Sequence, residues 1–111
     1  MELTRRQERG VEVVVLRGRL DAFTANGIEQ QILGLIDGGV RRLIVEMQEV
    51  AYVSSVGFRV LLVTAMRLRE LRGALAVSGL QPPVREAFDF GGFAALCPAF
   101  AATDEALERW S

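Results

Sequence analysis

The chain contains no histidine and no lysine, and all 13 of its basic residues are arginine. The missing histidine removes the most common general base and metal ligand in proteins. The missing lysine removes Schiff-base chemistry and the lysine of a phosphate-binding P-loop. A serine nucleophile would need such a base, and no G-x-S-x-G elbow is present. We therefore expect a protein without enzymatic activity, catalytic residues, metal or cofactor.

Cysteine and long apolar runs are also scarce. Cys97 is the only cysteine, so no intramolecular disulfide or cysteine metal cluster can form. Its apolar neighbourhood indicates a buried core residue. Residues 1–9 lack the apolar region of a secretory signal. The longest uncharged stretch, residues 90–103, is shorter than the ~20 residues of a spanning helix. We expect a cytoplasmic protein that does not insert into a membrane.

The formal net charge of this 111-residue chain is -1. Such a charge creates no overall field that would attract nucleic acid or an anionic membrane. The length fits one domain, residues 1–111, and half of the residues are hydrophobic, which is enough for a core without disulfides. We expect any protein partner to be recognised by a local surface.

Hydrophobic periodicity predicts alternating strands and helices. Strand patterns cover residues 2–7, 11–16, 41–47, 74–78 and 98–101. Helical patterns cover four segments: one that begins with Thr24 or Asn26 as cap and ends at Asp37, then 57–71, 82–90 and 104–110. In the third helix Val84, Ala87 and Phe88 are expected to point inward, and Phe88, Phe90 and Phe93 to form core or a lid. This order predicts an α/β fold with a single mixed sheet of four to five strands and about four helices packed on it.

Two of the four serines are adjacent, in the string V-S-S-V-G at residues 53–57. The first interpretation, a nucleophile, lacks a base. The second is a helix cap, because the helix must begin at Ser54 or Ser55 and one serine suffices for capping. The third is phosphorylation, since the free N–H groups of a first helical turn accept a phosphate and the surface charge changes locally.

Three stretches resemble the STAS domain family, and within it the stand-alone bacterial anti-sigma factor antagonists. "GRLDAFTA" is similar to the segment before the family's first helix, with its aspartate at Asp21. "RRLIVEMQEVAYVSSVGFRVLL" is similar to the central strand, loop and helix, and "GLQPPVREAFDFGGF" to the later strand, loop and helix. The family's aspartate before the phosphorylated serine is Ser54 here, and position 56 is valine. The resemblance covers essentially the whole chain and implies a STAS fold.

The resemblance also implies a function in partner switching and transcription regulation. In the family, an anti-sigma factor that is a serine kinase phosphorylates the loop serine, which corresponds to Ser55, with Ser54 as second choice. The unphosphorylated antagonist binds the kinase, phosphorylation releases it, and a PP2C-type phosphatase restores the first state. The positions implied at the kinase-facing surface are Asp21, Thr24, Asn26, Ser54, Ser55, Gly57 and Arg59.

Other interpretations remain open at this point. Asp21 is also a suitable helix cap, Gly57 permits close helix packing, and Arg59 is an ordinary solvated helix residue. A STAS domain also serves as a constitutive subunit of a transporter or sensory complex, without phosphorylation. No glycine-rich phosphate loop is present, so nucleotide binding is not expected.

Overall fold

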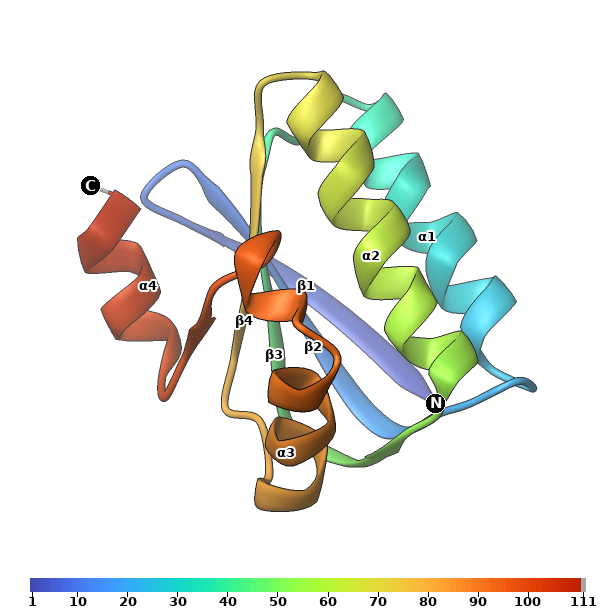
Figure 1. Cartoon of the computed structure of the whole chain (residues 1–111). Helices are drawn as coiled ribbons and strands as arrows, with labels where there is room; N and C mark the ends of the chain where they lie inside the picture. Colours follow the sequence, from blue (N-terminus) through green and yellow to red (C-terminus); the bar gives the residue numbers. More distant parts are fainter. Residues whose placement is uncertain (111) are drawn as a thin grey trace.

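The computed structural model describes residues 1–110, and a five-stranded mixed sheet runs through its centre (Figure 1). The strands lie in the order of the sequence; the first pair is antiparallel and the other pairs are parallel. The strands are β1 (Glu2–Glu8), β2 (Val11–Leu20), β3 (Arg42–Val53), β4 (Ala74–Ser78) and β5 (Ala99–Phe100). The predicted mixed sheet of four to five strands is confirmed.

Over residues 1–110, four α-helices and one short 3-10 helix pack on the two faces of this sheet. They are α1 (Ala25–Asp37), α2 (Ser55–Glu70), α3 (Pro82–Phe90), the 3-10 helix Phe93–Ala95 and α4 (Thr103–Trp110). Figure 1 shows α1 and α2 side by side on one face and α4 on the other. Within residues 1–110, no helix has the length and apolar character needed to cross a bilayer.

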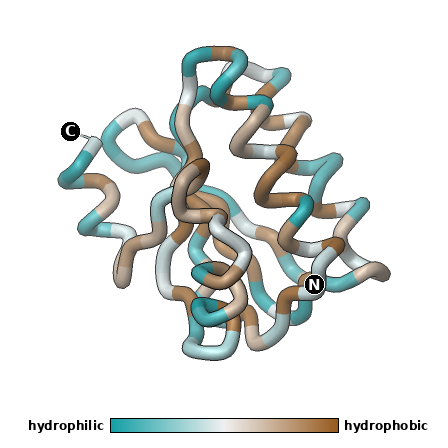
Figure 2. Tube along the Cα trace, viewed as in Figure 1, coloured by the Kyte–Doolittle hydropathy of each residue, from teal (hydrophilic) through white to brown (hydrophobic). Residues whose placement is uncertain are grey.

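The core has two layers because β2 and β3 bury both of their faces. Val14 and Leu16 of β2 belong to the larger layer, under α1, α2 and α3, whereas Val13 and Val15 belong to the smaller layer under α4. This explains the nearly continuous apolar run in each strand. Figure 2 shows hydrophobic and hydrophilic stretches alternating along α1 and α2, as expected of helices with one buried face.

Strands β2 and β3 extend further than predicted, to Leu20 and Val53. The predicted strand ends, at residues 16 and 47, were therefore wrong. Polar pairs across the strands hold these ends: Arg17 Nε lies 2.7 Å from a Glu49 carboxylate oxygen. The Arg19 guanidinium lies 4.4 Å from the centre of the Tyr52 ring. A search for apolar runs misses strand segments that are stabilised in this way.

The first and third helices differ in detail from the prediction. Thr24 occupies the N-cap position of α1, and Asn26 is already helical, so Asn26 is not the cap. In α3, Val84 and Phe88 are buried one turn apart, but Ala87 is exposed and Phe90 is 95% exposed. A helix of nine residues that rests on the core along one edge buries only one row of side chains.

Two further core predictions are settled by the packing. The Phe93 ring stacks on Phe58 and Phe88, with ring centres 5.0 and 5.8 Å apart, so Phe93 closes the larger layer as predicted. Cys97 is buried as predicted, and its burial raises the pKa of the thiol to about 12. Cys97 is therefore a core residue and not a reactive thiol.

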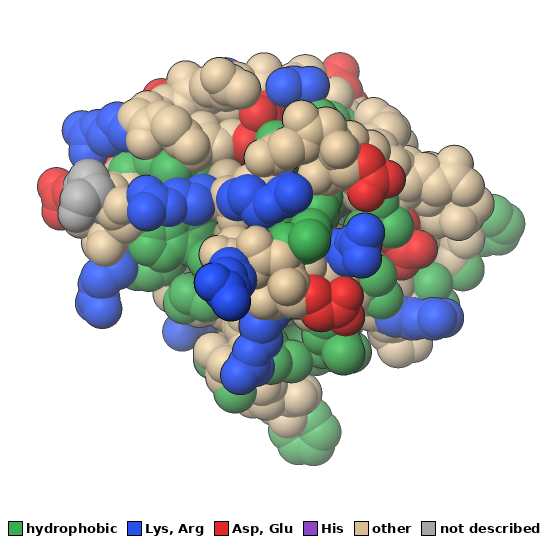
Figure 3. Space-filling model, turned by 90° about the horizontal axis from the view of Figure 1, so that it is seen from above, with side chains coloured by type: hydrophobic (Ala, Val, Ile, Leu, Met, Phe, Trp, Pro, Cys, Tyr) green, Lys and Arg blue, Asp and Glu red, His purple; other side chains and the backbone are tan. Residues whose placement is uncertain are grey.

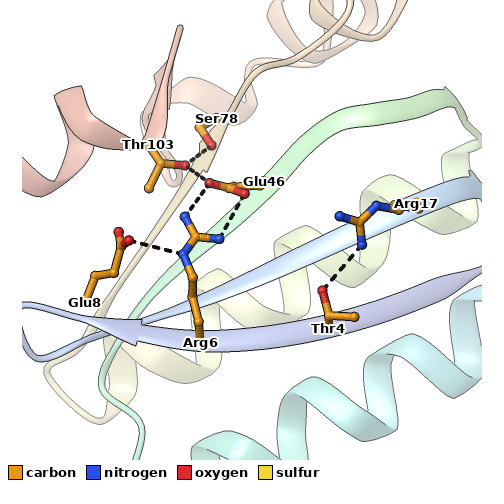
Figure 4. A network of polar contacts seen from close by, with 7 residues as sticks. All are labelled: Thr4, Arg6, Glu8, Arg17, Glu46, Ser78 and Thr103. Atoms are coloured by element: carbon orange, nitrogen blue, oxygen red, sulfur yellow. Dashed lines mark hydrogen bonds and ion pairs between the residues drawn. The ribbon is translucent and has the colours of Figure 1, made fainter.

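A polar network that was not predicted holds α4 on the smaller layer (Figure 4). Arg6 of β1 donates two hydrogen bonds, of 3.2 and 2.9 Å, to the buried Glu46 carboxylate of β3. Thr103, the first residue of α4, donates to the same carboxylate and also contacts the Ser78 hydroxyl at 2.9 Å. The Arg6 hydrogen bonds lower the pKa of Glu46. The carboxylate is therefore fully paired although it lies inside the protein.

Candidate functional site

The candidate site lies where the parallel strands β2 and β3 end, at one edge of the sheet. The Ser54 N–H donates to the Leu20 carbonyl oxygen over 2.9 Å. This bond places the segment that leads into α1 beside the segment that leads into α2. Side chains separated by about thirty residues in the sequence thereby meet on one surface, in the arrangement that parallel strands favour for functional sites.

Ser54 is the N-cap of α2. Its backbone is extended, with φ -81° and ψ 173°, and its Oγ accepts a hydrogen bond from the Gly57 N–H at 3.2 Å. Its carbonyl oxygen accepts from the Phe58 N–H at 2.9 Å. Serine thus supplies the oxygen that an aspartate would supply as a cap at the same position. The replacement of aspartate by Ser54 therefore leaves the start of the helix intact.

Ser55 is the first residue of α2 and is exposed. Its hydroxyl makes no hydrogen bond to any residue in the described part of the chain. The first N–H groups of a helix have no partner inside the helix, and the first turn of α2 contains no acidic residue. The Ser55 hydroxyl is thus a solvent-facing group at the positive end of a 16-residue helix.

Gly57 has a packing role. A Cβ atom at this position would lie 2.5 Å from the Leu20 carbonyl oxygen and 2.9 Å from a Val53 methyl carbon. Real Cβ atoms do not approach backbone atoms so closely, so only glycine lets α2 begin against the ends of β2 and β3. Gly57 is itself buried, and it shapes the surface without presenting a side chain to a partner.

Asp21 organises the neighbouring segment. One carboxylate oxygen accepts hydrogen bonds from the N–H groups of Phe23 and Thr24, at 3.0 and 3.3 Å. Thr24 in turn donates its hydroxyl to the Arg19 carbonyl oxygen at 2.8 Å. The Phe23 N–H bond is the main reason why the pKa of Asp21 is lowered, so its negative charge is stabilised. Asp21 thus caps the turn before α1. The N-cap of the helix itself is Thr24, so the alternative interpretation of Asp21 as the helix cap was wrong.

Three apolar side chains around this site were missed by the sequence reasoning. Phe23 is 96% exposed, and Val56 and Tyr52 are 44% and 43% exposed. All three lie within three residues of Asp21 or Ser55. The available signal was a phenylalanine between polar turn residues, in a segment too short to bury it. Aromatic and aliphatic side chains exposed together are characteristic of protein-binding surfaces.

The predicted site residues occupy one end of the molecule. Asp21 and Thr24 are half-buried in one turn, and Ser54 and Ser55 stand at the adjacent helix start. Gly57 is buried at the start of α2, whereas Asn26 and Arg59 are exposed near the starts of α1 and α2. We call this surface, together with Phe23, Tyr52 and Val56, the serine surface. Chemically it offers the unpaired hydroxyl of Ser55 beside exposed apolar side chains, which suits recognition by another protein.

Comparison with known proteins agrees with this architecture. The family model of the STAS domain matches residues 2–106, and the chain belongs to the STAS domain family. BtrV of Bordetella bronchiseptica, whose name assigns it provisionally to the anti-sigma factor antagonists, is 34% identical over 98 residues. That match covers 88% of this chain and 84% of BtrV. The predicted membership of this family and its antagonist branch is confirmed.

Two solved structures are similar over nearly the whole chain. An anti-sigma factor antagonist from Mycobacterium paratuberculosis has a TM-score of 0.89 at 25% identity, over 97% of this chain and 92% of that one. The Bacillus cell fate determinant SpoIIAA in its phosphorylated form has a TM-score of 0.76 at 22% identity, over 99% of this chain and 100% of that one. The likeness to SpoIIAA shows the shared fold, and the predicted STAS fold is confirmed.

Proposed function

We propose that this protein is an anti-sigma factor antagonist controlled by phosphorylation of Ser55. In its unphosphorylated form it binds an anti-sigma factor that is a serine kinase, and the phosphate on Ser55 releases that kinase. The observation that carries the proposal is that the two adjacent serines have different roles in the structure. Ser54 is used as the helix cap, whereas Ser55 presents an unpaired hydroxyl to solvent.

The domain can gain this phosphate without unfolding. Phosphorylation adds a charge of about -1.5 to -2, and the N-terminal end of a helix stabilises negative charge. The N–H groups of Ser55 and Val56, the first two residues of α2, have no main-chain acceptor within residues 1–110. Arg59, four residues further along α2, is exposed and has no ionic partner among residues 1–110. A residue at this spacing lies on the same helix face and can pair with the phosphate.

Release of the kinase follows from where the charge appears. Val56 follows Ser55 in the chain, and Phe23 lies in the turn at the same edge of the sheet. A partner that covers this surface must also remove water from Ser55. Removing water from a neutral hydroxyl costs little free energy, whereas removing it from a phosphate dianion costs much more. The Asp21 carboxylate, kept ionised by its hydrogen bonds, already places a negative charge on the same surface. The same exposure gives a PP2C-type phosphatase access to the phosphate, which restores the binding form.

Phosphate transfer tests this function. The protein is incubated with its cognate anti-sigma factor kinase and ATP, and the phosphate is located by mass spectrometry. We expect one phosphate on Ser55, no transfer to Ser55→Ala, and transfer to Ser54→Ala. Phosphate on another residue, or normal switching by Ser55→Ala, would contradict the mechanism. Stable binding without any phosphate transfer would instead support a constitutive subunit.

A further inference from the structure

A second surface lies at the opposite end of the molecule, where β3 begins and where α1 and α2 end. Figure 3 views the molecule from this side and shows arginine side chains gathered across it, with fewer acidic ones between them. The net charge of -1 therefore conceals a local excess of positive charge on this side. The sequence reasoning used only the net charge and did not detect this positively charged end.

A pocket of about 600 Å³ opens on this end. It lies between the β1–β2 turn, the end of α1 and the start of β3. Four arginines line it, Arg5, Arg9, Arg41 and Arg42, and the acidic residue in its lining is Glu12. The volume falls within the range of about 300–1,000 Å³ that small-molecule sites occupy.

The positive charge of this pocket is only partly neutralised by the protein. Glu12 is already paired, because Arg5 Nε lies 2.7 Å from its carboxylate and Gln7 donates a further hydrogen bond. Arg41 donates to the carbonyl oxygens of Ile36 and Val40, both at 2.9 Å. These bonds offset the negative end of the α1 dipole. Arg9 has no hydrogen-bond or ionic partner in residues 1–110.

Glycines keep the pocket open. Its walls include Gly10, Gly34 and Gly39, and a Cβ atom built on any of the three would meet no other atom within 4 Å. The space beside the arginines is therefore free of protein. Gly34 lies inside α1 with ordinary helical geometry, so a larger side chain there would enter this space without straining the backbone.

We propose that this pocket binds a small anion that carries two or more negative charges on phosphate groups. Guanidinium groups match phosphate oxygens with paired hydrogen bonds, and several arginines around one space suit a multiply charged ligand. Leu35 and Val40 are the large apolar residues of the lining, which leaves little surface to anchor the side chains of a peptide. The site is separate from the serine surface, and the proposal does not depend on phosphorylation of Ser55.

Titration with inorganic pyrophosphate, followed by NMR and calorimetry at constant ionic strength, tests this site. We expect saturable binding with amide shifts at Gly10, Gly34 and Gly39. Parallel titrations use adenosine diphosphate and an acidic hexapeptide. If adenosine diphosphate binds more tightly than pyrophosphate, the ligand is an organic phosphate. If the two bind with equal affinity, the pocket recognises the phosphate groups alone. Binding of the peptide at comparable affinity would overturn the proposal, as would a lack of pyrophosphate binding at millimolar concentration.

Three variants separate the pocket from a general charge effect. Gly34→Leu fills the space while every arginine remains, and we expect it to abolish pyrophosphate binding without lowering the melting temperature. Arg9→Gln removes an unpaired charge and should weaken binding about fivefold. Arg72→Gln removes an exposed arginine outside the pocket lining and should change affinity less than about twofold, since screened charges contribute little. Equal weakening by Arg72→Gln and Arg9→Gln, or unchanged binding by Gly34→Leu, would refute the pocket.

Discussion

The two adjacent serines should contribute unequally to stability. Ser54→Ala removes the hydroxyl oxygen that accepts the Gly57 N–H at 3.2 Å, and the loss of such a cap destabilises a protein by about 1 kcal/mol. For a domain of this size that energy corresponds to a fall in melting temperature of roughly 4 °C. Ser55→Ala removes an exposed hydroxyl without a partner, and such surface changes stay within about 0.5 kcal/mol.

Urea unfolding followed by circular dichroism measures both variants under identical conditions. Ser54→Asp is the matched control, because aspartate caps a helix as well as serine does, and it should restore the stability that alanine removes. The reasoning would be refuted if Ser55→Ala destabilised the protein as much as Ser54→Ala. It would also be refuted if Ser54→Asp remained as unstable as Ser54→Ala.

Three further predictions concern other parts of the molecule. Gly57→Ala should destabilise the protein by about 1–3 kcal/mol in urea unfolding, because its Cβ would lie 2.5 Å from the Leu20 carbonyl oxygen; wild-type stability would contradict this. Arg6 lowers the pKa of Glu46 below the ordinary carboxyl value of 4.5. The pair therefore stabilises the fold fully when the pH is above 4.5, and less as the pH falls below that value. Glu46→Gln should therefore be less stable at neutral pH, and its difference from the wild type should shrink toward pH ~3 in unfolding titrations. Phe23→Ala should keep the wild-type melting temperature and weaken kinase binding about tenfold or more in surface plasmon resonance, and unchanged binding would remove Phe23 from the interface.

Local patterns in the sequence were sufficient for most of the fold. The spacing of Ile28, Ile32 and Ile36 along α1 and the glycines after Asp37 are local signals, and the helix follows them. The same holds for the β-branched run that begins at Val11. The resemblance to STAS domains then located the serine surface. Asp21 and Ser55 correspond to positions of family motifs, and their elements are joined by the bond from Ser54 to Leu20.

What the sequence did not reveal depends on residues that meet only in three dimensions. The Glu46 network joins four elements, and no spacing along the chain indicates that Arg6, Ser78 and Thr103 converge on it. The choice of Ser54 as cap depends on its backbone angles, which the adjacent serines left open. The arginines of the pocket are likewise separated by about thirty residues, and net charge conceals their proximity.

The affinity of the kinase for protein carrying phosphoserine at position 55 tests the central claim most directly. The phosphoserine is incorporated during translation, and binding is measured by calorimetry beside unmodified protein and Ser55→Ala. We expect the phosphorylated protein to keep its circular dichroism spectrum and melting temperature, and to bind the kinase about 100-fold more weakly, because a desolvated like charge costs several kcal/mol. Ser55→Ala should bind like the unmodified protein. Equal affinity of the phosphorylated and unmodified proteins, or unfolding of the phosphorylated one, would contradict the account.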